Sequence, residues 1–173
     1  MDCHLRALIE NDMDMIYNWR NLESIRENMF HDQMIPYKDH CNWFRNVLIN
    51  QAKYYRLFVN QNKPLGLVSF KESNQQSQTC LWGFYIGEST APKGSGTIMG
   101  SLALDYAFQC LSMRKVIGEV LSTNQKSTKF HLKLGFIQTG LDKNKLWRNG
   151  QPVDILQFQL DSEEWDRQKA KVN

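Results

Sequence analysis

The sequence predicts a domain of the α/β (α+β) class, in which helices pack on a mixed sheet. Segments typical of strands dominate the middle of the chain. The most apolar of them, residues 80–86, leads through a Gly-rich loop into an amphipathic helix. Near the C-terminus, Asn149-Gly150 stands between two strand-like segments and indicates a β-hairpin. Together these observations predict a sheet that is crossed at least once by a helical connection.

The first fifty residues are expected to form one strand and three helices. Alternating apolar residues favour the strand, and apolar residues at helical spacing favour the helices. Asn11 and Asp12 offer an N-cap, and Pro36 favours a helix start. The expected segments are a strand at 3–10 and helices at 13–21, 23–30 and Tyr37–Asn50. The last helix should bury the face formed by Trp43, Phe44, Val47 and Leu48.

The remaining segments are expected to be mainly strands. A turn at 60–64 should join a hairpin, and a polar turn at 72–79 should precede the central apolar strand. Gly135 should stop a short helix. The expected strands are 54–59, 65–70, 80–86, Lys115–Leu121, 136–141, 146–147 and 153–160. The expected helices are 97–111 and 127–134, followed by a polar helix or frayed end at 162–171.

Length and composition restrict the class of protein. The 173 residues suit a single domain over residues 1–173, with a polar C-terminal tail at 161–173. Hydrophobic residues make up 42% and the net charge is +3, which excludes a mainly disordered chain and a dedicated nucleic-acid binder. No apolar segment reaches the roughly 18 residues of a membrane-spanning helix, and the N-terminus is too polar for a signal peptide. We therefore expect no nucleic-acid or membrane partner.

The four cysteines are widely and irregularly spaced. A disulfide framework or a zinc site would place them in short-interval pairs, which do not occur here. We therefore expect reduced core cysteines in a cytoplasmic protein without a metal. The residues are Cys3, Cys41, Cys80 and Cys110.

The Gly-rich loop at residues 91–97, APKGSGT, is a candidate anion site. Its two glycines allow close approach of the backbone, and the following helix offers unpaired N–H groups. Together with Lys93 these groups would suit a pyrophosphate. The spacing is neither that of a Walker loop nor that of a dinucleotide fingerprint, so a simple strand-to-helix turn is the alternative.

A second segment supports the anion site. Residues 124–136, NQKSTKFHLKLGF, resemble the N-x-x-A-x-x-[FL]-Y-x-x-x-G-F segment of the Gcn5-related N-acetyltransferases, the GNAT family. The loop at residues 94–96 resembles the acetyl-CoA pyrophosphate loop of that family. The resemblance implies the GNAT fold, with a mixed, mostly antiparallel central sheet of about seven strands, a V-shaped splay and helices on both faces. It also implies an acetyl-CoA-dependent N-acetyltransferase.

The resemblance assigns acetyl-CoA, the co-substrate, to particular residues. Pantetheine would lie along the central strand and bind backbone groups near Tyr85 and Ile86. Loop amides would hold the pyrophosphate, and Asn124 would contact the cofactor arm. The full set of expected cofactor-binding residues is Tyr85, Ile86, Lys93, Gly94, Ser95, Gly96, Thr97, Asn124, Ser127 and His131.

Two catalytic candidates follow from the same resemblance. His131 stands where most relatives carry the tyrosine that protonates the departing thiolate, and a histidine could replace it as the general acid. A packing histidine, with water as the acid, is the alternative. Ser69 matches a serine that lies beside the substrate and could orient the amine or a water molecule; a strand hydroxyl without a catalytic role is its alternative. Cys80 lies in a buried strand, which disfavours an acyl-enzyme.

A narrower resemblance concerns the acceptor. In the N-terminal half, the residues Trp19-Arg20-Asn21, Met29 and Tyr37-x-x-His40-x-x-Trp43 resemble the family members of pseudaminic acid biosynthesis. That pathway serves flagellin or surface glycosylation. It implies transfer to the 4-amino group of a UDP-linked 4-amino-4,6-dideoxy sugar. The implied substrate-binding residues are Arg20, Asn21, Met29, His40, Trp43 and Ser69. A protein N-terminal acetyltransferase of the ribosomal-protein type and a non-catalytic acyl-CoA-binding module are the alternatives, and a homodimer is possible.

Overall fold

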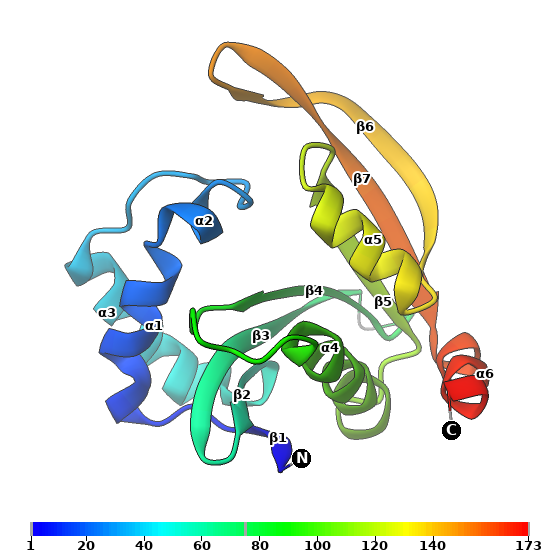
Figure 1. Ribbon diagram of the computed structural model, residues 1–173, viewed down its shortest axis with the longest axis horizontal. Helices are drawn as coiled ribbons and strands as arrows, with labels where there is room; N and C mark the ends of the chain where they lie inside the picture. Colours follow the sequence, from blue (N-terminus) through cyan, green and yellow to red (C-terminus); the bar gives the residue numbers. More distant parts are fainter. Residues whose placement is uncertain (1, 75, 173) are drawn as a thin grey trace. The chain divides into compact units, whose positions relative to one another are not determined.

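The computed structural model describes residues 2–74 and 76–172, and it confirms a mixed seven-stranded sheet with helices (Figure 1). The strand order is β1-β2-β3-β4-β5-β7-β6. The strands are β1 (Cys3–Arg6), β2 (Tyr55–Asn60), β3 (Lys63–Asn74), β4 (Thr79–Ile86), β5 (Lys115–Leu121), β6 (Ile137–Arg148) and β7 (Gln151–Asp161). The α-helices are α1 (Met13–Arg20), α2 (Glu23–Arg26), α3 (Tyr37–Asn50), α4 (Ser95–Asp105), α5 (Gln125–Lys133) and α6 (Ser162–Val172). Shorter helical turns are η1 (Glu10–Asp12), η2 (Ala52–Tyr54) and the π-helical η3 (Tyr106–Cys110).

Strand pairing gives the sheet its mixed character. The β4–β5 pair is parallel, and its register joins Thr79–Leu81 to Lys115–Ile117. The β1–β2, β2–β3, β5–β7 and β6–β7 pairs are antiparallel. The chain divides into two compact units, Met1–Phe70 with Gly83–Ala103, and Lys71–Trp82 with Leu104–Asn173. The V-shaped splay and the single domain over residues 1–173 stay predictions.

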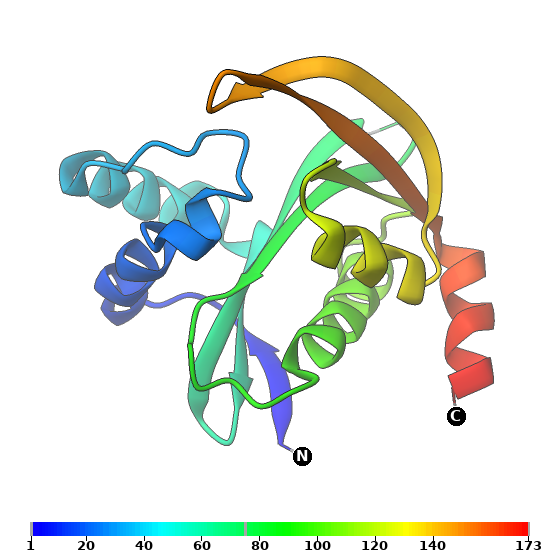
Figure 2. The same cartoon turned by 45° about the horizontal axis from the view of Figure 1, so that its top comes forward.

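The first unit is built on a core shared by α1, α2, α3, β2 and β3. Figure 2 shows these three helices close together in blue and cyan. The face expected for α3 is confirmed, because Phe44 and Val47 are fully buried while Trp43 and Leu48 pack against the core. The buried members of this core are Leu8, Ile16, Trp19, Ile25, Phe44, Val47, Leu57, Val59 and Leu67.

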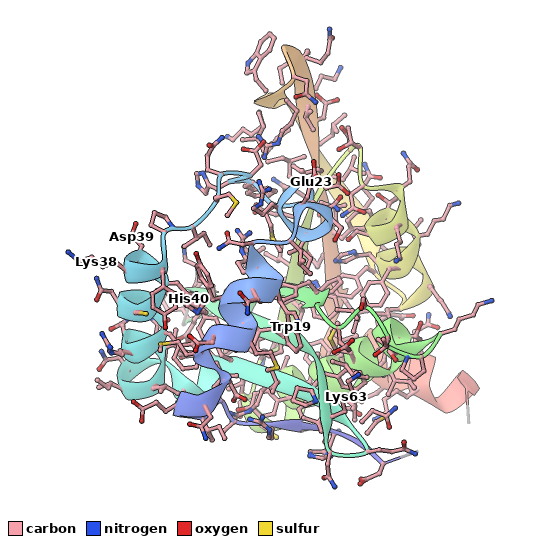
Figure 3. The ribbon with its side chains drawn as sticks, turned by 60° about the vertical axis from the view of Figure 1, so that its left-hand side comes forward. Trp19, Glu23, Lys38, Asp39, His40 and Lys63 are labelled. Atoms are coloured by element: carbon pink, nitrogen blue, oxygen red, sulfur yellow. The ribbon has the colours of Figure 1, made fainter. Side chains whose placement is uncertain are left out.

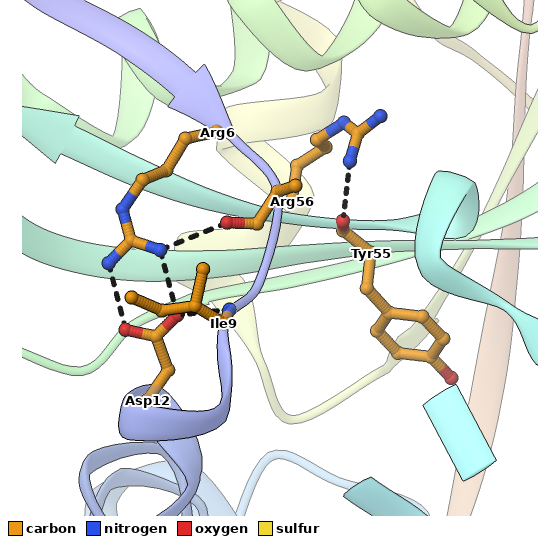
Figure 4. Close-up of polar contacts among 6 residues, drawn as sticks. Arg6, Ile9, Asp12, Tyr55 and Arg56 are labelled. Atoms are coloured by element: carbon orange, nitrogen blue, oxygen red, sulfur yellow. Dashed lines mark hydrogen bonds and ion pairs between the residues drawn. The ribbon is translucent and has the colours of Figure 1, made fainter. Parts of the chain in front are cut away.

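Asp12 fixes the connection between β1 and α1. Its carboxylate accepts two hydrogen bonds from the guanidinium of Arg6, at 2.7 and 2.8 Å, and a third from the backbone amide of Ile9 at 2.9 Å (Figure 4). The expected N-cap role is therefore corrected: the side chain points back toward the strand and makes no cap hydrogen bond to α1. The pairing of β1 with β2 ends at Arg6, and η1 follows at residues 10–12, so β1 is shorter than expected.

The turns of two hairpins can be compared with the sequence. The β2–β3 turn is shorter than expected, and the β6–β7 turn is as expected. Gln61 and Asn62 have φ of 49° and 63°, so the β2–β3 turn needs only two residues and Pro64 pairs with Val59 inside the sheet. Asn149 and Gly150, with φ of 49° and 74°, form the expected β6–β7 turn. The two strand segments expected at 136–141 and 146–147 are one strand, β6, with irregular pairing near Asn144.

The second unit carries the long β6–β7 hairpin, orange in Figure 1, and α6, which follows it. The expected polar end of the chain is an ordered helix. The Trp165 side chain is 5% exposed, and its indole N–H donates to the carboxylate of Asp105 at 2.8 Å. The ammonium of Lys169 pairs with the same carboxylate at 2.7 Å. These contacts explain why a polar helix stays attached to the rest of this unit.

Within residues 2–74 and 76–172, no helix is long and apolar enough to cross a membrane.

Replacing Asp12 should destabilise the protein strongly. Asp12 is 4% exposed, and Asp12→Ala leaves the Arg6 guanidinium and the Ile9 amide without their partner. The expected loss in free energy of unfolding is roughly 2–4 kcal/mol, measured by urea denaturation. Glu164→Gln, which breaks the exposed pair with Arg167, is the control and should cost less than about 1 kcal/mol. Equal losses in both variants would contradict a special role for Asp12.

Candidate active site

The Gly-rich loop has the conformation expected of an anion site. Gly94 has φ of +93°, and α4 begins immediately afterwards at Ser95, two residues earlier than predicted. A Cβ at Gly94 or at Gly96 would meet no described atom within 4 Å, so the space next to both glycines is open. The first amides of a helix have no partner inside it, and its dipole favours an anion there. The loop therefore fits the pyrophosphate of acetyl-CoA.

One expected loop donor is already occupied. The Ser95 amide donates to the carbonyl of Pro92 at 3.1 Å, and the Ser95 side chain is buried. Ser95 therefore closes the turn, and we expect the amides that follow it in α4 to take the larger share of the anion. Lys93 is exposed next to them, as a mobile cation at the loop would be.

Lys63 of the β2–β3 hairpin, which no sequence motif singles out, holds the loop. The Lys63 ammonium donates to the Thr90 hydroxyl at 2.7 Å and lies 3.5 Å from the Glu88 carboxylate. Glu88 in turn accepts hydrogen bonds from the amide and hydroxyl of Thr90, which lower the pKa of its carboxyl. Figure 3 labels Lys63. These contacts order the segment that leads from β4 to α4.

The backbone of β4 distinguishes Tyr85 from Ile86. The amide of Gly87 donates to the Leu65 carbonyl on β3 at 2.9 Å, and the Tyr85 carbonyl oxygen lies against Gly66 of the same strand. Backbone groups of alternate residues face the same edge of a strand. The Tyr85 backbone is therefore directed at β3, and that of Ile86 is expected to face the opposite edge. Of the two residues, Ile86 suits a pantetheine better.

The first unit contains a pocket of about 450 Å³. It brings together five of the six residues expected at the acceptor site, namely Arg20, Met29, His40, Trp43 and Ser69. The other lining residues are Ile16, Ile35, Asp39, Tyr55, Leu67, Gly83, Phe84 and Tyr85. The walls are mostly aromatic and apolar, which suits the faces of rings.

Asn21 does not line this pocket, so its expected substrate role is corrected. Its side-chain N–H donates to the Ile35 carbonyl at 3.1 Å, and its side-chain oxygen accepts from the Ile35 amide at 2.8 Å. Both ends of the amide are thus used to hold the segment that carries Ile35, which does line the pocket. Asn21 shapes the site without facing it.

His40 is a buried, neutral member of the pocket wall. Its side chain is 2% exposed, and Nε2 lies 2.8 Å from the carbonyl oxygen of Met13. Figure 3 shows His40 on α3 next to α1, which carries Trp19. Burial lowers the pKa of His40, although the hydrogen bond to Met13 opposes the shift. A neutral imidazole packed on Trp43 offers a ring face and one polar nitrogen, and no charge.

Ser69 and the side chain of Tyr85 lie on neighbouring strands in the same wall. The Ser69 hydroxyl is 3.4 Å from the Gly83 carbonyl, a long hydrogen bond that a ligand could replace. The Tyr85 hydroxyl and the Nη1 atom of Arg20 are buried and have no hydrogen-bond partner among the described residues. The family resemblance assigned a role only to the backbone of Tyr85. No local pattern marks a hydroxyl as unpaired, because pairing depends on the folded surroundings.

His131 lies in the second unit, among aromatic rings. Its side chain is 2% exposed and packs on Trp82, Phe136 and Phe158. The indole N–H of Trp82 donates to Nε2 at 3.0 Å, so Nδ1 carries the proton and donates to the Ser127 carbonyl at 2.8 Å. Gly118 leaves room for the His131 imidazole and the Trp82 indole, because a Cβ at Gly118 would collide with the imidazole.

These surroundings oppose the expected general-acid role of His131. Burial lowers its pKa to about 4, and only the hydrogen bond to Ser127 acts against this. At neutral pH the ring is uncharged, and both of its nitrogens already have partners. We infer that His131 is the packing histidine of the alternative interpretation. It joins α5 to Trp82 of β4.

Asn124 is the N-cap of α5, and Ser127 lies in the first turn of that helix. The Asn124 side chain accepts from the Ser127 amide at 3.0 Å, as an N-cap residue does. The Asn124 oxygen is therefore used within the helix, which leaves its NH₂ group as the donor for a cofactor arm. The cofactor roles of Asn124 and Ser127 stay predictions.

Comparison with known proteins identifies the family. A family model described as an acetyltransferase (GNAT) domain matches residues 3–137. The chain belongs to the GNAT family, and it is an acetyl-CoA-dependent N-acetyltransferase.

Two relatives with different names are about equally similar to this chain. Spermidine N(1)-acetyltransferase of Vibrio cholerae serotype O1 is 27% identical over 160 residues, covering 90% of this chain and 91% of that protein. Acetyltransferase PseH of Campylobacter jejuni subsp. jejuni serotype O:23/36 is 24% identical over 137 residues, covering 79% and 84%. A crystal structure of the Vibrio cholerae spermidine N-acetyltransferase with CoA and spermine has a TM-score of 0.84 at 23% identity, covering 94% and 97%. The fold is shared, and the acceptor must be inferred from the pocket.

Substituting Gly94 should weaken acetyl-CoA binding specifically. Gly94→Ala meets no neighbour, so its cost is the left-handed backbone at φ +93°, about 1 kcal/mol. If the loop distorts by that amount, KM for acetyl-CoA should rise roughly fivefold, measured by steady-state kinetics. Gly150→Ala, at φ +74° in the β6–β7 turn with equally open surroundings, is the matched control. An unchanged KM in Gly94→Ala would contradict this prediction.

The pH dependence of stability should reveal the buried imidazole of His131. An unfolded histidine has a pKa of about 6.5, whereas the pKa of folded His131 is about 4. At pH values between about 4 and 6.5, the His131 imidazole is protonated in the unfolded chain and unprotonated in the folded chain. The free energy of unfolding should therefore fall as pH drops from about 6.5 to 4, by about 3 kcal/mol. Denaturation at several pH values should show a smaller fall in His131→Gln.

The same variant tests the catalytic role directly. A general acid contributes roughly 10²–10⁴-fold to rate, whereas a packing residue affects kcat through stability. We expect kcat of His131→Gln to stay within about tenfold of the unaltered protein below its melting temperature. A larger loss, with the basic limb of the pH–rate profile removed, would restore the general-acid assignment.

Proposed function

We propose that the protein transfers acetyl from acetyl-CoA to the 4-amino group of a UDP-linked 4-amino-4,6-dideoxy sugar, in pseudaminic acid biosynthesis for flagellin or surface glycosylation. The observation that carries this proposal is the composition of the pocket in the first unit. Its walls are aromatic and apolar, and its charged groups are the guanidinium of Arg20 and the exposed carboxylate of Asp39. An acceptor with rings and a negative charge fits this lining.

The same lining disfavours a polyamine. Spermidine carries several positive charges, and each charge that leaves water needs a carboxylate or a comparable acceptor. Among the described residues that line the pocket, Asp39 is the only acid, and Arg20 would repel an ammonium. The similarity to spermidine acetyltransferases therefore supports the cofactor half of the reaction more than the acceptor half.

Direct transfer fits the cysteines better than an acyl-enzyme. Cys80 on β4 is 0% exposed, and burial raises the pKa of its thiol to about 12. A thiol in that state is a poor nucleophile at neutral pH. We infer that the acceptor amine attacks the thioester carbonyl directly through a tetrahedral intermediate. The hydroxyl of Ser69 is placed in the pocket wall, where it can orient the amine or a water molecule.

Acceptor competition tests the proposal. Release of free CoA thiol from acetyl-CoA is measured with the UDP-linked 4-amino sugar, with spermidine, and with a peptide that has a free N-terminus. We expect turnover with the amino sugar and at least a hundredfold lower kcat/KM with the other two, the equivalent of about 3 kcal/mol. Preferred turnover of spermidine would refute the sugar assignment, and preferred turnover of the peptide would favour the protein N-terminal alternative.

Kinetic order tests direct transfer. With both substrates varied, initial rates should give intersecting double-reciprocal lines, and Cys80→Ala should not abolish turnover. Parallel lines, with incorporation of labelled acetyl into the protein, would instead demand a covalent intermediate.

A further inference from the structure

We propose that the guanidinium of Arg20 and the hydroxyl of Tyr85 together bind an anionic phosphoryl oxygen of the acceptor. This inference rests on the proposed function, and it assigns a binding role to the Tyr85 side chain. Arg20 is the last residue of α1, and Tyr85 is the penultimate residue of β4. Both line the pocket of the first unit. Elements that are distant in the sequence thus bring two donors to one pocket.

Both donors are buried and unused. Nη1 of Arg20 and Oη of Tyr85 have no hydrogen-bond partner within the described residues, and less than 1 Å² of each atom is exposed. Buried polar groups are nearly always hydrogen-bonded, so two unpaired atoms in one pocket call for an explanation. A ligand that accepts hydrogen bonds from both atoms would supply it.

The charges of the two groups define the ligand. Burial raises the pKa of Tyr85, and nearby Arg20 only partly offsets this, so the phenol stays a neutral O–H donor. Burial lowers the pKa of Arg20 and Arg26 adds repulsion, while Tyr85 acts in the opposite direction. A guanidinium nevertheless remains protonated in proteins. The pair presents one positive charge and hydrogen-bond donors, which repels an ammonium and attracts an anion.

Neighbouring charges leave this positive charge without a partner. Arg26 is engaged elsewhere, because its side chain donates to the carbonyls of Asn21 at 3.0 Å and Asp32 at 2.6 Å. Asp39 lines the same pocket but makes no ion pair with Arg20 among the described residues. A neutral acceptor would leave the guanidinium charge uncompensated in an apolar pocket. A phosphoryl group compensates it and matches the forked geometry of a guanidinium.

The test compares stability with binding in the variants Tyr85→Phe and Arg20→Met. Tyr54→Phe and Arg45→Met, neither of which lines the pocket, are the matched controls. UDP is the probe, and its Kd is measured by calorimetry on the full chain with and without acetyl-CoA. We expect Kd for UDP to rise about tenfold in Tyr85→Phe and more than about thirtyfold in Arg20→Met. The two control variants should change Kd for UDP less than twofold and should leave KM for acetyl-CoA unchanged.

Tyr85→Phe has a second signature that a packing role would not produce. Because it removes an unpaired buried hydroxyl, it should raise the melting temperature of the ligand-free protein by about 2–4 °C while weakening UDP binding. Should Arg20→Met fail to fold, Arg20→Lys retains the charge without the fork and is expected to weaken UDP binding by a smaller factor. Unchanged UDP affinity in Tyr85→Phe and in the Arg20 variant would overturn the proposal, as would failure of the unaltered protein to bind UDP.

The two proposals fail in different ways. Turnover of the UDP-linked amino sugar with the same KM in Tyr85→Phe, Arg20→Met and the unaltered protein would overturn the phosphoryl site and leave the proposed function intact. Binding of UDP that depends on both residues, without turnover of that sugar, would support the phosphoryl site and refute the proposed acceptor.

Discussion

The buried carboxylate of Asp12 determines where α1 begins, and the acceptor pocket depends on that helix. Its hydrogen bonds to Arg6 and Ile9 fix α1 relative to β1. Seven residues later Trp19 packs directly against Gly87, at the place where a Cβ of that residue would lie. Arg20 follows and enters the pocket. A single buried charge at the start of the helix thus determines where a second charge, proposed to bind the acceptor, is placed at its end.

Buried polar groups of the first unit differ in whether they are hydrogen-bonded. Asp12 and Asn21 lie in or near buried surroundings, and the side-chain oxygens and N–H groups of both residues are hydrogen-bonded. Arg20 and Tyr85 retain unpaired atoms. A free energy cost of about 1–3 kcal/mol for each unpaired group is acceptable in a binding site, because the ligand recovers it. This contrast distinguishes residues that build the pocket from the two residues that we propose to face the acceptor.

His131 illustrates how a family position can change its chemistry. The segment around it resembles the family closely enough to suggest that histidine replaces a catalytic tyrosine. In the folded chain its nitrogens are occupied by Trp82 and Ser127, and burial favours the neutral ring. The position then contributes to packing between α5 and the sheet. If His131 is not the general acid, as we infer, water is the simplest source of the proton for the departing thiolate.

The sequence by itself determined the fold class, the turn at Asn149-Gly150, the Gly-rich loop before α4 and five of the residues that line the pocket proposed for the acceptor. These features depend on short-range backbone preferences or on family motifs, which are readable in a linear chain. Only the tertiary structure decided that Asn21 supports the pocket from behind, that Asp12 points toward β1, and that Arg20 and Tyr85 share one cavity with unpaired donors. Hydrogen-bond pairing and burial depend on residues far apart in sequence, so no local pattern could reveal them.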